Sequence, residues 1–421
     1  MKKLLILLIL SFFSSQGLSA SCPDGNEPIK TVSADGSYYV YNCGNTNNEQ
    51  TSSTVNDSND VLNAPKAEFY QRQYDMNSKV DKKLSLRRTI NPFLPYNWKI
   101  RESSKKNGYG LYFSGGYNFK NSWDAIQLKE LYWVYYYPGQ WWSYWTNTNQ
   151  KRFLTDIKFD HDNEYGKTRK QDISNPEFAI EASKEVEITK NAGFNGIFLD
   201  WWHSNHPGIN DKVGFTKNRK RILQKIYEKN GDDFLLMGNV NWETDLMYEY
   251  LNAVFLELYK PPDGRTGSYT FEEIEKIEKL ILTLNENLRY PKVIAVQPWK
   301  VTNERTLLDR ESQINKQLAR LFSAMSAVLA EHGYIIYTDN NRDSDIDDHG
   351  HYYYDVYSVD LGKPLSKHTP IAQGVAYKKF EKGYIAFNRL EYDVTVNFGD
   401  FEVVIPSMDA VFMNEDGSNI L

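Results

Sequence analysis

Residues 193–200 read Gly-Phe-Asn-Gly-Ile-Phe-Leu-Asp, a turn followed by an apolar run that ends in the carboxylate Asp200. An uninterrupted apolar run of this kind is typical of a strand that is buried on both faces of a parallel sheet. The same pattern returns at residues 253–257, where Ala-Val-Phe-Leu precedes Glu257. An ionised side chain at the end of a buried strand needs a reason, so both carboxylates are candidates for chemistry.

Strand-like and helical segments alternate on both sides of these two runs, which predicts an α/β fold with parallel strands. Five clear strand–helix units after residue 175 favour a closed (β/α)8 TIM barrel over an open doubly wound sheet. No Gly-x-Gly-x-x-Gly sequence supports the open alternative. The expected strands cover residues 110–113, 131–137, 153–159 (or the stretch before 172), 195–200, 234–237, 253–257, 292–296 and 334–338. The expected helices start after Asn175 and cover residues 216–229, 271–288 and 310–331.

The barrel is expected to occupy residues 66–351, with smaller parts on either side of it. Residues 21–65 are expected to form a small β-hairpin segment and then a flexible linker, because a β-rich run precedes a stretch rich in Asn, Thr and Ser. Residues 352–421 are expected to form a C-terminal antiparallel β domain. Its predicted strands cover residues 375–380, 383–388, 394–398 and 402–405.

Residues 1–20 have the anatomy of a signal peptide. Lys2 and Lys3 precede an apolar core, and small residues follow it. The protein is therefore expected to be exported, either to the periplasm or out of the cell, with lipid anchoring through Cys22 as the alternative. In an oxidising compartment Cys22 and Cys43 are expected to form a disulfide that closes the N-terminal segment.

Composition excludes several other roles for this chain of 421 residues. A formal net charge of −6 argues against a nucleic-acid partner. No other apolar run approaches membrane-spanning length, so no integral membrane segment is expected once the signal is removed. Aromatic residues reach 14%, and aromatic rings stack well on flat apolar ligand surfaces.

Functional residues of a TIM barrel follow the C-terminal ends of its strands. Asp200 and Glu257 follow two strands that have one strand between them, and glycosidic bond cleavage requires two opposed carboxyl groups. One attacks the anomeric carbon or activates water, and the other protonates the leaving oxygen. Other side chains that follow strands are expected to bind the carbohydrate substrate: Trp201, Trp202, His203, Asn239, Asn241, Tyr259, Gln297, Trp299 and Asp339.

The segment 193–200 resembles the strand-four signature of glycoside hydrolases related to the endo-α-1,4-polygalactosaminidases, although Asn195 replaces their usual Asp. Residues 172–176, Asp-Ile-Ser-Asn-Pro, are similar to the entry to the preceding helix in those families, and residues 254–257 are similar to their second acidic strand end. The resemblance extends over roughly residues 108–415. It implies a TIM-barrel hydrolase with Asp200 as nucleophile and Glu257 as acid/base.

Two other classes of function remain open from the sequence. One is a non-catalytic glycan-binding surface protein that keeps the barrel. The other is a metal-dependent hydrolase that uses Asp200, His203 and His206, which follow one another at intervals of three residues. Pro207 favours a loop over a helix at this point, so we expect no metal and no cofactor.

Overall fold

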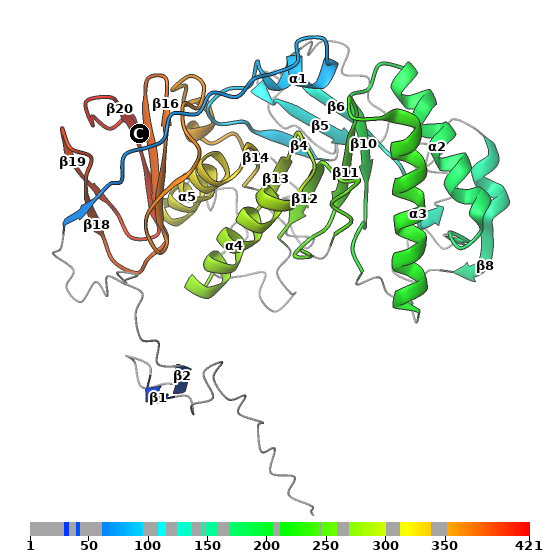
Figure 1. Cartoon of the computed structure of the whole chain (residues 1–421), viewed down its shortest axis with the longest axis horizontal. Helices are drawn as coiled ribbons and strands as arrows, with labels where there is room; N and C mark the ends of the chain where they lie inside the picture. The colour runs from blue at the N-terminus through cyan, green and yellow to red at the C-terminus, as the bar shows by residue number, and fades with distance from the viewer. Residues whose placement is uncertain are drawn as a thin grey trace, which may run out of the picture. The chain divides into compact units, whose positions relative to one another are not determined.

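Eight parallel strands form the main sheet of the computed structural model (Figure 1). In order across the sheet they are β14 (His332–Ile335), β13 (Val293–Gln297), β12 (Ala253–Glu257), β11 (Leu235–Asn239), β10 (Gly196–Leu199), β6 (Ile126–Glu130), β5 (Leu111–Ser114) and β4 (Phe93–Pro95). Pro92 forms a parallel bridge with Ile335, whose N–H donates to Asn91 O. These contacts join the two edge strands, so the sheet forms a nearly closed barrel.

The residues described are 29–32, 39–42, 61–95, 108–114, 124–136, 145, 148–158, 169–204, 211–244, 246–258, 269–299, 312–337 and 352–421. The chain divides into two units, Met1–Asn56 and Asp57–Leu421. In the first unit, β1 (Ile29–Val32) and β2 (Tyr39–Asn42) pair as an antiparallel hairpin. Cys22 and Cys43, the predicted disulfide pair, lie outside the described residues, as does the predicted signal peptide.

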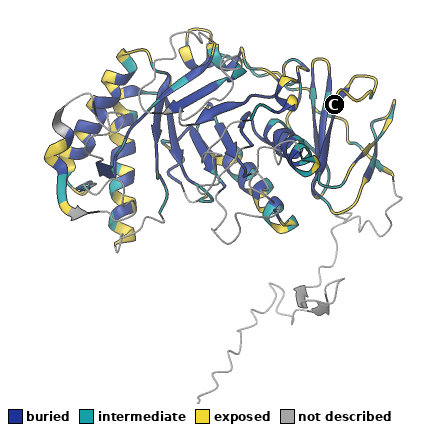
Figure 2. Cartoon of the chain, turned by 180° about the vertical axis from the view of Figure 1, so that it is seen from behind, coloured by how far each residue is buried: buried dark blue, intermediate teal, exposed yellow. Residues whose placement is uncertain are grey.

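Large apolar side chains fill the barrel interior. Phe113 of β5 contacts Phe198 of β10 and Phe255 of β12, with ring centroids 4.5 and 5.0 Å apart. All three rings are at most 1% exposed. Figure 2 shows the strands as the most deeply buried part of the fold, as expected for parallel strands that are covered on both faces.

A short helix, α1 (Lys79–Leu84), closes the N-terminal end of the barrel, and Figure 1 shows it above the strands. Val80 and Leu84 join the apolar cluster of the barrel interior. Polar side chains of this segment bind residues just before β6, β11 and β13: Lys83 donates to Ala125 O, Ser78 donates to Asp233, and Asp81 accepts from Tyr290. The opposite, C-terminal end is therefore the end that carries the candidate site.

Four helices pack on the outside of the barrel: α2 (Pro176–Asn191), α3 (Lys212–Asn230), α4 (Phe271–Asn287) and α5 (Gln313–Leu329). Each begins with a polar cap. Asn175 caps α2 as predicted, and Thr270 and Glu273 form a capping box at α4. Within the described part of the chain, no helix is both long and apolar enough to cross a bilayer.

Two small sheets form the C-terminal β domain. The larger is antiparallel and contains β15 (Thr369–Ala372), β16 (Val375–Phe380), β17 (Gly383–Asn388) and β20 (Asp409–Asn414). The smaller contains β19 (Glu402–Ile405), β18 (Val394–Asn397) and β3 (Val61–Asn63). β3 pairs in parallel with β18, so a strand from the predicted linker completes the domain. A 3-10 turn (Asp355–Ser358) connects barrel and domain.

The structure confirms the predicted barrel and C-terminal β domain. The predicted strand at 110–113 is also present but is the second strand of the barrel, and the next two predicted strands are wrong. The first barrel strand is β4, and the segment predicted as first is the second, β5. The third is β6, which precedes the aromatic run predicted as a strand. That run contains only the short strand β7 (Tyr135–Tyr136). β7 forms a separate antiparallel sheet, outside the barrel, with β9 (Arg169–Gln171) and β8 (Leu154–Lys158). A 3-10 helix (Thr148–Phe153) leads directly into β8. The run is apolar because Trp133 and Val134 pack into the apolar core between the barrel strands and the helices around them.

Candidate active site

Three neighbouring strands deliver polar side chains to the C-terminal end of the barrel. Asp200 comes two residues after the interior residue Phe198, and Glu257 comes two residues after Phe255. Side chains two apart on a strand point to the same face, so both carboxylates continue the interior of the barrel. Asn239 ends β11, which lies between β10 and β12.

The Asn239 amide joins the two carboxylates. Its Nδ2 donates to Asp200 Oδ1 at 3.0 Å and to Glu257 Oε2 at 2.9 Å. Asn239 and Asp200 are 3% and 7% exposed, and Glu257 is half-buried. The amide nitrogen carries two N–H donors, so one of them can bind each carboxyl group.

Two tryptophans hold the Asp200 backbone and side chain in place. The Trp133 indole Nε1 donates to Asp200 O at 2.7 Å, and the Trp201 N–H donates to Asp200 Oδ1 at 2.9 Å. Trp201 has a φ of 55°, in the left-handed region that a bulky side chain rarely adopts. Backbone strain of this kind is stored at functional sites, and here it lies next to a candidate catalytic residue.

Glu130 is a third carboxylate at this end of the barrel, and the sequence analysis missed it. It is the last residue of β6, is 4% exposed and pairs in register with Phe198. The alternation of apolar and polar residues in Ile-Gln-Leu-Lys-Glu, residues 126–130, is the sequence signal for it. The apolar run that follows, residues 131–137, has the stronger strand pattern and so masks this signal.

Gln297 and Trp299 extend the site along β13. Gln297 pairs in register with Glu257 and is fully buried. The Trp299 N–H donates to the Tyr269 hydroxyl oxygen, and the Trp299 side chain is 5% exposed. Burial raises the pKa of Tyr269, so its hydroxyl stays protonated. Gln297 therefore ends the strand next to Glu257, and Trp299 follows two residues after that strand ends.

Trp202 and Trp201 point into different surroundings. Trp202 is 1% exposed and packs against Trp133, with ring centroids 4.3 Å apart. A side chain added at Gly238 would meet the Trp202 ring at 2.8 Å, so a glycine on β11 makes room for it. Trp202 is therefore part of the core, whereas Trp201 is half-buried and its ring lies 6.3 Å from that of Tyr135.

His203 lies beside Trp201, with ring centroids 5.9 Å apart. Burial lowers the pKa of His203, the Glu243 carboxylate opposes the shift and Arg219 adds to it. The ring is therefore neutral at neutral pH. Among the described residues, no three His, Cys, Asp or Glu side chains are placed to hold a metal ion. His206, part of the metal alternative, lies outside those residues.

The remaining predicted binding residues are only partly described. Asn241 is half-buried and has a left-handed φ of 49°, which Asn tolerates better than most residues. Tyr259 and Asp339 lie outside the described residues. The structure thus brings Asp200, Asn239 and Glu257 into direct contact, with Gln297, Trp201 and His203 on the same or neighbouring strand ends.

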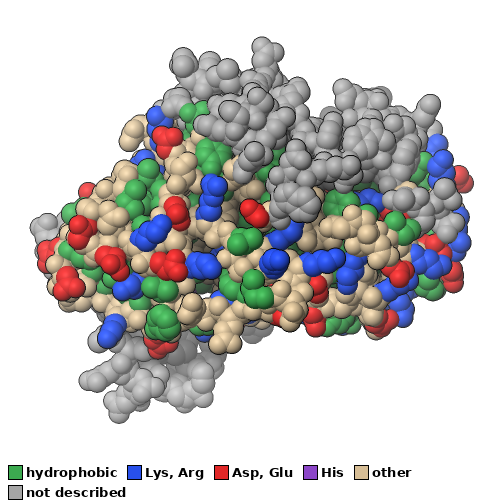
Figure 3. All heavy atoms as spheres, turned by 90° about the horizontal axis from the view of Figure 1, so that it is seen from above, with side chains coloured by type: hydrophobic (Ala, Val, Ile, Leu, Met, Phe, Trp, Pro, Cys, Tyr) green, Lys and Arg blue, Asp and Glu red, His purple; other side chains and the backbone are tan. Residues whose placement is uncertain are grey.

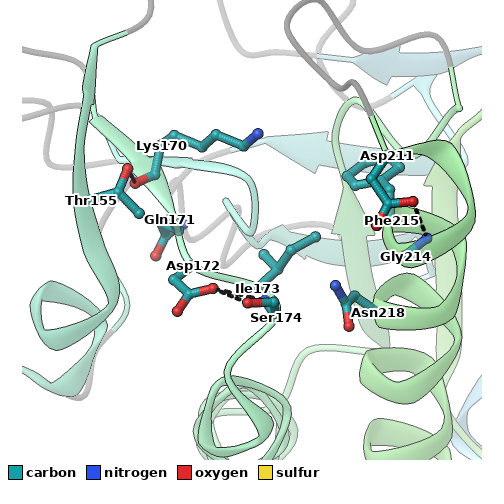
Figure 4. Close-up of a pocket in the computed structure, with 10 residues that line it drawn as sticks. All are labelled: Thr155, Lys170, Gln171, Asp172, Ile173, Ser174, Asp211, Gly214, Phe215 and Asn218. Carbon is teal, nitrogen blue, oxygen red and sulfur yellow. Dashed lines mark hydrogen bonds between the residues drawn. The ribbon is translucent and has the colours of Figure 1, made fainter.

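A separate pocket of about 250 Å³ lies between the outer sheet and the starts of α2 and α3 (Figure 4). Phe215 and Ile173 form its apolar part, and the polar groups around them come from Thr155, Lys170, Gln171, Asp172, Ser174, Asp211, Gly214 and Asn218. The Phe215 ring stacks on Trp133, which in turn binds Asp200. Neither of the paired carboxylates lines this pocket.

The family to which the chain is matched agrees with the chemistry of the site. The model of hypothetical glycosyl hydrolase family 15 matches residues 129–384, more than half of the chain. The glycoside hydrolase domain of PelA from Pseudomonas aeruginosa is similar, at 12% identity and a TM-score of 0.41, over 62% of this chain and 98% of that chain. Cyclic alpha-maltosyl-(1→6)-maltose hydrolase from Arthrobacter globiformis is similar at 13% identity and a TM-score of 0.39, over 69% of this chain and 74% of that chain. No curated protein matches.

The family match covers β10, β11 and β12, and with them both carboxylates and the amide between them. It also covers the outer sheet and most of the strands of the barrel. The chain therefore belongs to hypothetical glycosyl hydrolase family 15 and is a glycoside hydrolase of the TIM-barrel type.

Proposed function

We propose that this glycoside hydrolase cleaves O-glycosidic bonds of an oligo- or polysaccharide with net retention of anomeric configuration. The observation that carries the proposal is the shared amide of Asn239. Because both carboxylate oxygens bind the same nitrogen, they lie within about 6 Å of each other. Retaining enzymes hold their carboxyl groups about 5–5.5 Å apart, whereas inverting enzymes need about 6.5–9.5 Å to admit a water molecule.

Asp200 is the nucleophile in this proposal. Its Oδ1 accepts from Trp201 N–H and from Asn239, so the anion is stabilised and its position is fixed. Asp200 attacks the anomeric carbon, the bond to the leaving oxygen breaks, and a glycosyl ester forms on the carboxylate. The deep burial of Asp200 limits the access of water to that ester.

Glu257 is the acid and then the base. It protonates the leaving oxygen in the first step and takes a proton from the attacking water in the second. Its side chain is more exposed than that of Asp200, which suits a group that meets first a leaving group and then water. Burial and the resemblance both support this assignment of the two roles.

A pair of isosteric variants tests these roles. Asp200→Asn should abolish turnover of every substrate found in a polysaccharide and aryl-glycoside panel, and Asp156→Asn, an exposed carboxylate on β8, should leave it intact. Glu257→Gln should lose about 10²–10⁴-fold in kcat on natural linkages but keep activity on aryl glycosides whose leaving group needs no proton. Near wild-type hydrolysis by either variant would disprove the assignment.

Stereochemistry gives an independent measurement. Proton NMR of the first product formed should show the anomer of the substrate, because two successive displacements restore the configuration. The opposite anomer would contradict retention while leaving the two carboxylates as the reacting groups.

We also propose that the protein is exported, to the periplasm or beyond it, and that Cys22 and Cys43 form a disulfide. The support is the signal-like sequence of residues 1–20 and the oxidising chemistry of compartments outside the cytoplasm. Thiol labelling of the mature protein, before and after reduction, should reveal two thiols only after reduction. Two reactive thiols beforehand, or a lipid on Cys22, would contradict it.

A further inference from the structure

A group of basic side chains meets where the barrel joins the C-terminal β domain, far along the chain from the carboxylates. It consists of Arg72, Arg87, His332 and Lys378, which we call the junction cluster. The two arginines flank α1, His332 begins β14, and Lys378 lies on β16. Figure 3 looks onto the end of the molecule that carries α1 and shows lysine and arginine side chains across the middle of this face.

His332 lies at the centre of the cluster and lacks hydrogen bonds. It is fully buried, and neither Nδ1 nor Nε2 has a hydrogen-bond partner among the described residues. The only ring beside it in that part of the chain is Tyr74, with centroids 5.9 Å apart. A neutral imidazole always carries one donor and one acceptor, so a buried ring without partners needs an explanation.

The arginines also have unsatisfied donors. Arg87 Nε is buried without a partner, and within the described chain no carboxylate pairs with this guanidinium. Arg72 pairs with Glu331, the residue before His332, yet its own Nε is also buried without a partner. Leaving a buried donor unsatisfied destabilises the folded state, and more so when the group is charged.

Lys378 is a second cation that no described carboxylate pairs with, after Arg87. It is 4% exposed, and its Nζ donates to Ala327 O and Ala330 O at 2.7 and 2.9 Å, at the end of α5. Burial and the charge of Arg87 lower the pKa of Lys378. Burial and the charges of Arg87, Arg72 and Lys378 lower the pKa of His332 well below its usual value. Arg72 and Lys378 also bind residues close in sequence to His332, because Arg72 pairs with Glu331 and Lys378 donates to Ala330 O. Glu331 is the one carboxylate that pairs with the cluster in the described structure.

We propose that the junction cluster binds a small tetrahedral oxyanion of the phosphate or sulfate type, which fastens the C-terminal β domain to the barrel. Guanidinium groups match oxyanions with parallel N–H donors, and the His332 ring supplies a further N–H. A bound oxyanion accepts hydrogen bonds from the unsatisfied donors and also compensates the excess positive charge. A buried water molecule satisfies the donors but leaves the charges uncompensated.

Thermal unfolding tests the proposal in a buffer free of phosphate and sulfate. Inorganic phosphate should raise the unfolding midpoint by several degrees in a saturable way, because a ligand bound only to the folded state stabilises it. Sodium chloride at the same ionic strength should raise it much less. Arg87→Gln should lose the phosphate effect, and Arg88→Gln, the exposed neighbour of the same type, should keep it.

Stability measured without phosphate gives a second expectation for Arg87→Gln, opposite in sign to the first. Without phosphate, Arg87→Gln should be at least as stable as wild type, because it removes a cation from an uncompensated cluster. If Arg87→Gln does not fold, calorimetric titration of wild-type protein with inorganic phosphate tests the proposal by itself. We expect one phosphate site per chain. Equal stabilisation by chloride, no measurable phosphate binding, or phosphate stabilisation that survives Arg87→Gln would overturn the proposal.

Discussion

At the scale of single residues, Asn239 is the side chain that contacts both candidate catalytic carboxylates. One amide nitrogen supplies a hydrogen bond to each of the two carboxylates, so the side chain both holds them apart and places positive partial charge between them. A donor placed between two carboxyl groups reduces the repulsion between them.

Replacing this amide should therefore change the pH dependence of the reaction. Asn239→Asp puts a third carboxylate between Asp200 and Glu257, which raises the pKa of the whole group and should move both limbs of the kcat/KM profile to higher pH. Asn239→Ala removes the donor without adding charge and should move the profile less. An unshifted profile for Asn239→Asp would show that the amide does not control these groups.

The sequence revealed the two carboxylates but not their immediate surroundings. Asp200 and Glu257 were visible because a charge that ends an apolar run stands out against it. Glu130 ends a strand with an alternating pattern, so its charge did not stand out. Nothing in the sequence distinguishes the core residue Trp202 from its half-buried neighbour Trp201, because only the left-handed turn at Trp201 separates their directions.

At the scale of elements, the larger C-terminal sheet has two unlike faces. Phe387 of β17 belongs to the core shared with α5 and is fully buried. Phe398, just after β18, packs on the other side of the sheet with Tyr377 and is only half-buried. The first face fastens the domain to the barrel, and the second holds the two small sheets together.

This difference predicts unequal effects of two matched variants. Phe387→Ala should reduce the free energy of unfolding by about 3–5 kcal/mol, because a fully buried ring leaves a cavity that packed neighbours cannot fill. Phe398→Ala should cost clearly less. Urea unfolding curves would measure both values, and a larger loss for Phe398→Ala would mean that the second face dominates stability.

Elements were predicted well where the pattern was simple. The strands at 375–380, 383–388 and 402–405 appear with the predicted bounds, because turn residues delimit them in the sequence. Strand β4 was missed because it is three residues long and ends in a proline, and so short a run has no measurable period. The outer sheet was taken for barrel strands because burial against α2 requires the same apolar residues as burial inside a barrel.

At the scale of the whole molecule, the barrel and the β domain share several polar connections. Arg320 of α5 binds both oxygens of Asp409 on β20. Gln317 donates to the carbonyls of Ser407 and Met408. Together with the shared core, these bonds tie the two parts into one folding unit.

We therefore expect one cooperative unfolding transition for residues 57–421. All 10 tryptophans precede residue 300, so their fluorescence reports on the barrel, and hydrogen exchange of peptide 375–388 reports on the β domain. Both signals should change over the same range of urea concentration, which is the test of two-state behaviour. Earlier loss of protection in the β domain would show that it unfolds alone.

The parallel pairing of β3 with β18 has a consequence for biosynthesis. The ribosome completes residues 61–63 roughly 330 residues before their partners at 395–397. At common rates of synthesis of about 5–20 residues per second, this strand therefore waits tens of seconds with its backbone groups unpaired. Asn63 and the polar residues around it keep that waiting segment from becoming an aggregation-prone edge, and β3 finds its partner only after most of the barrel and the larger sheet have been made.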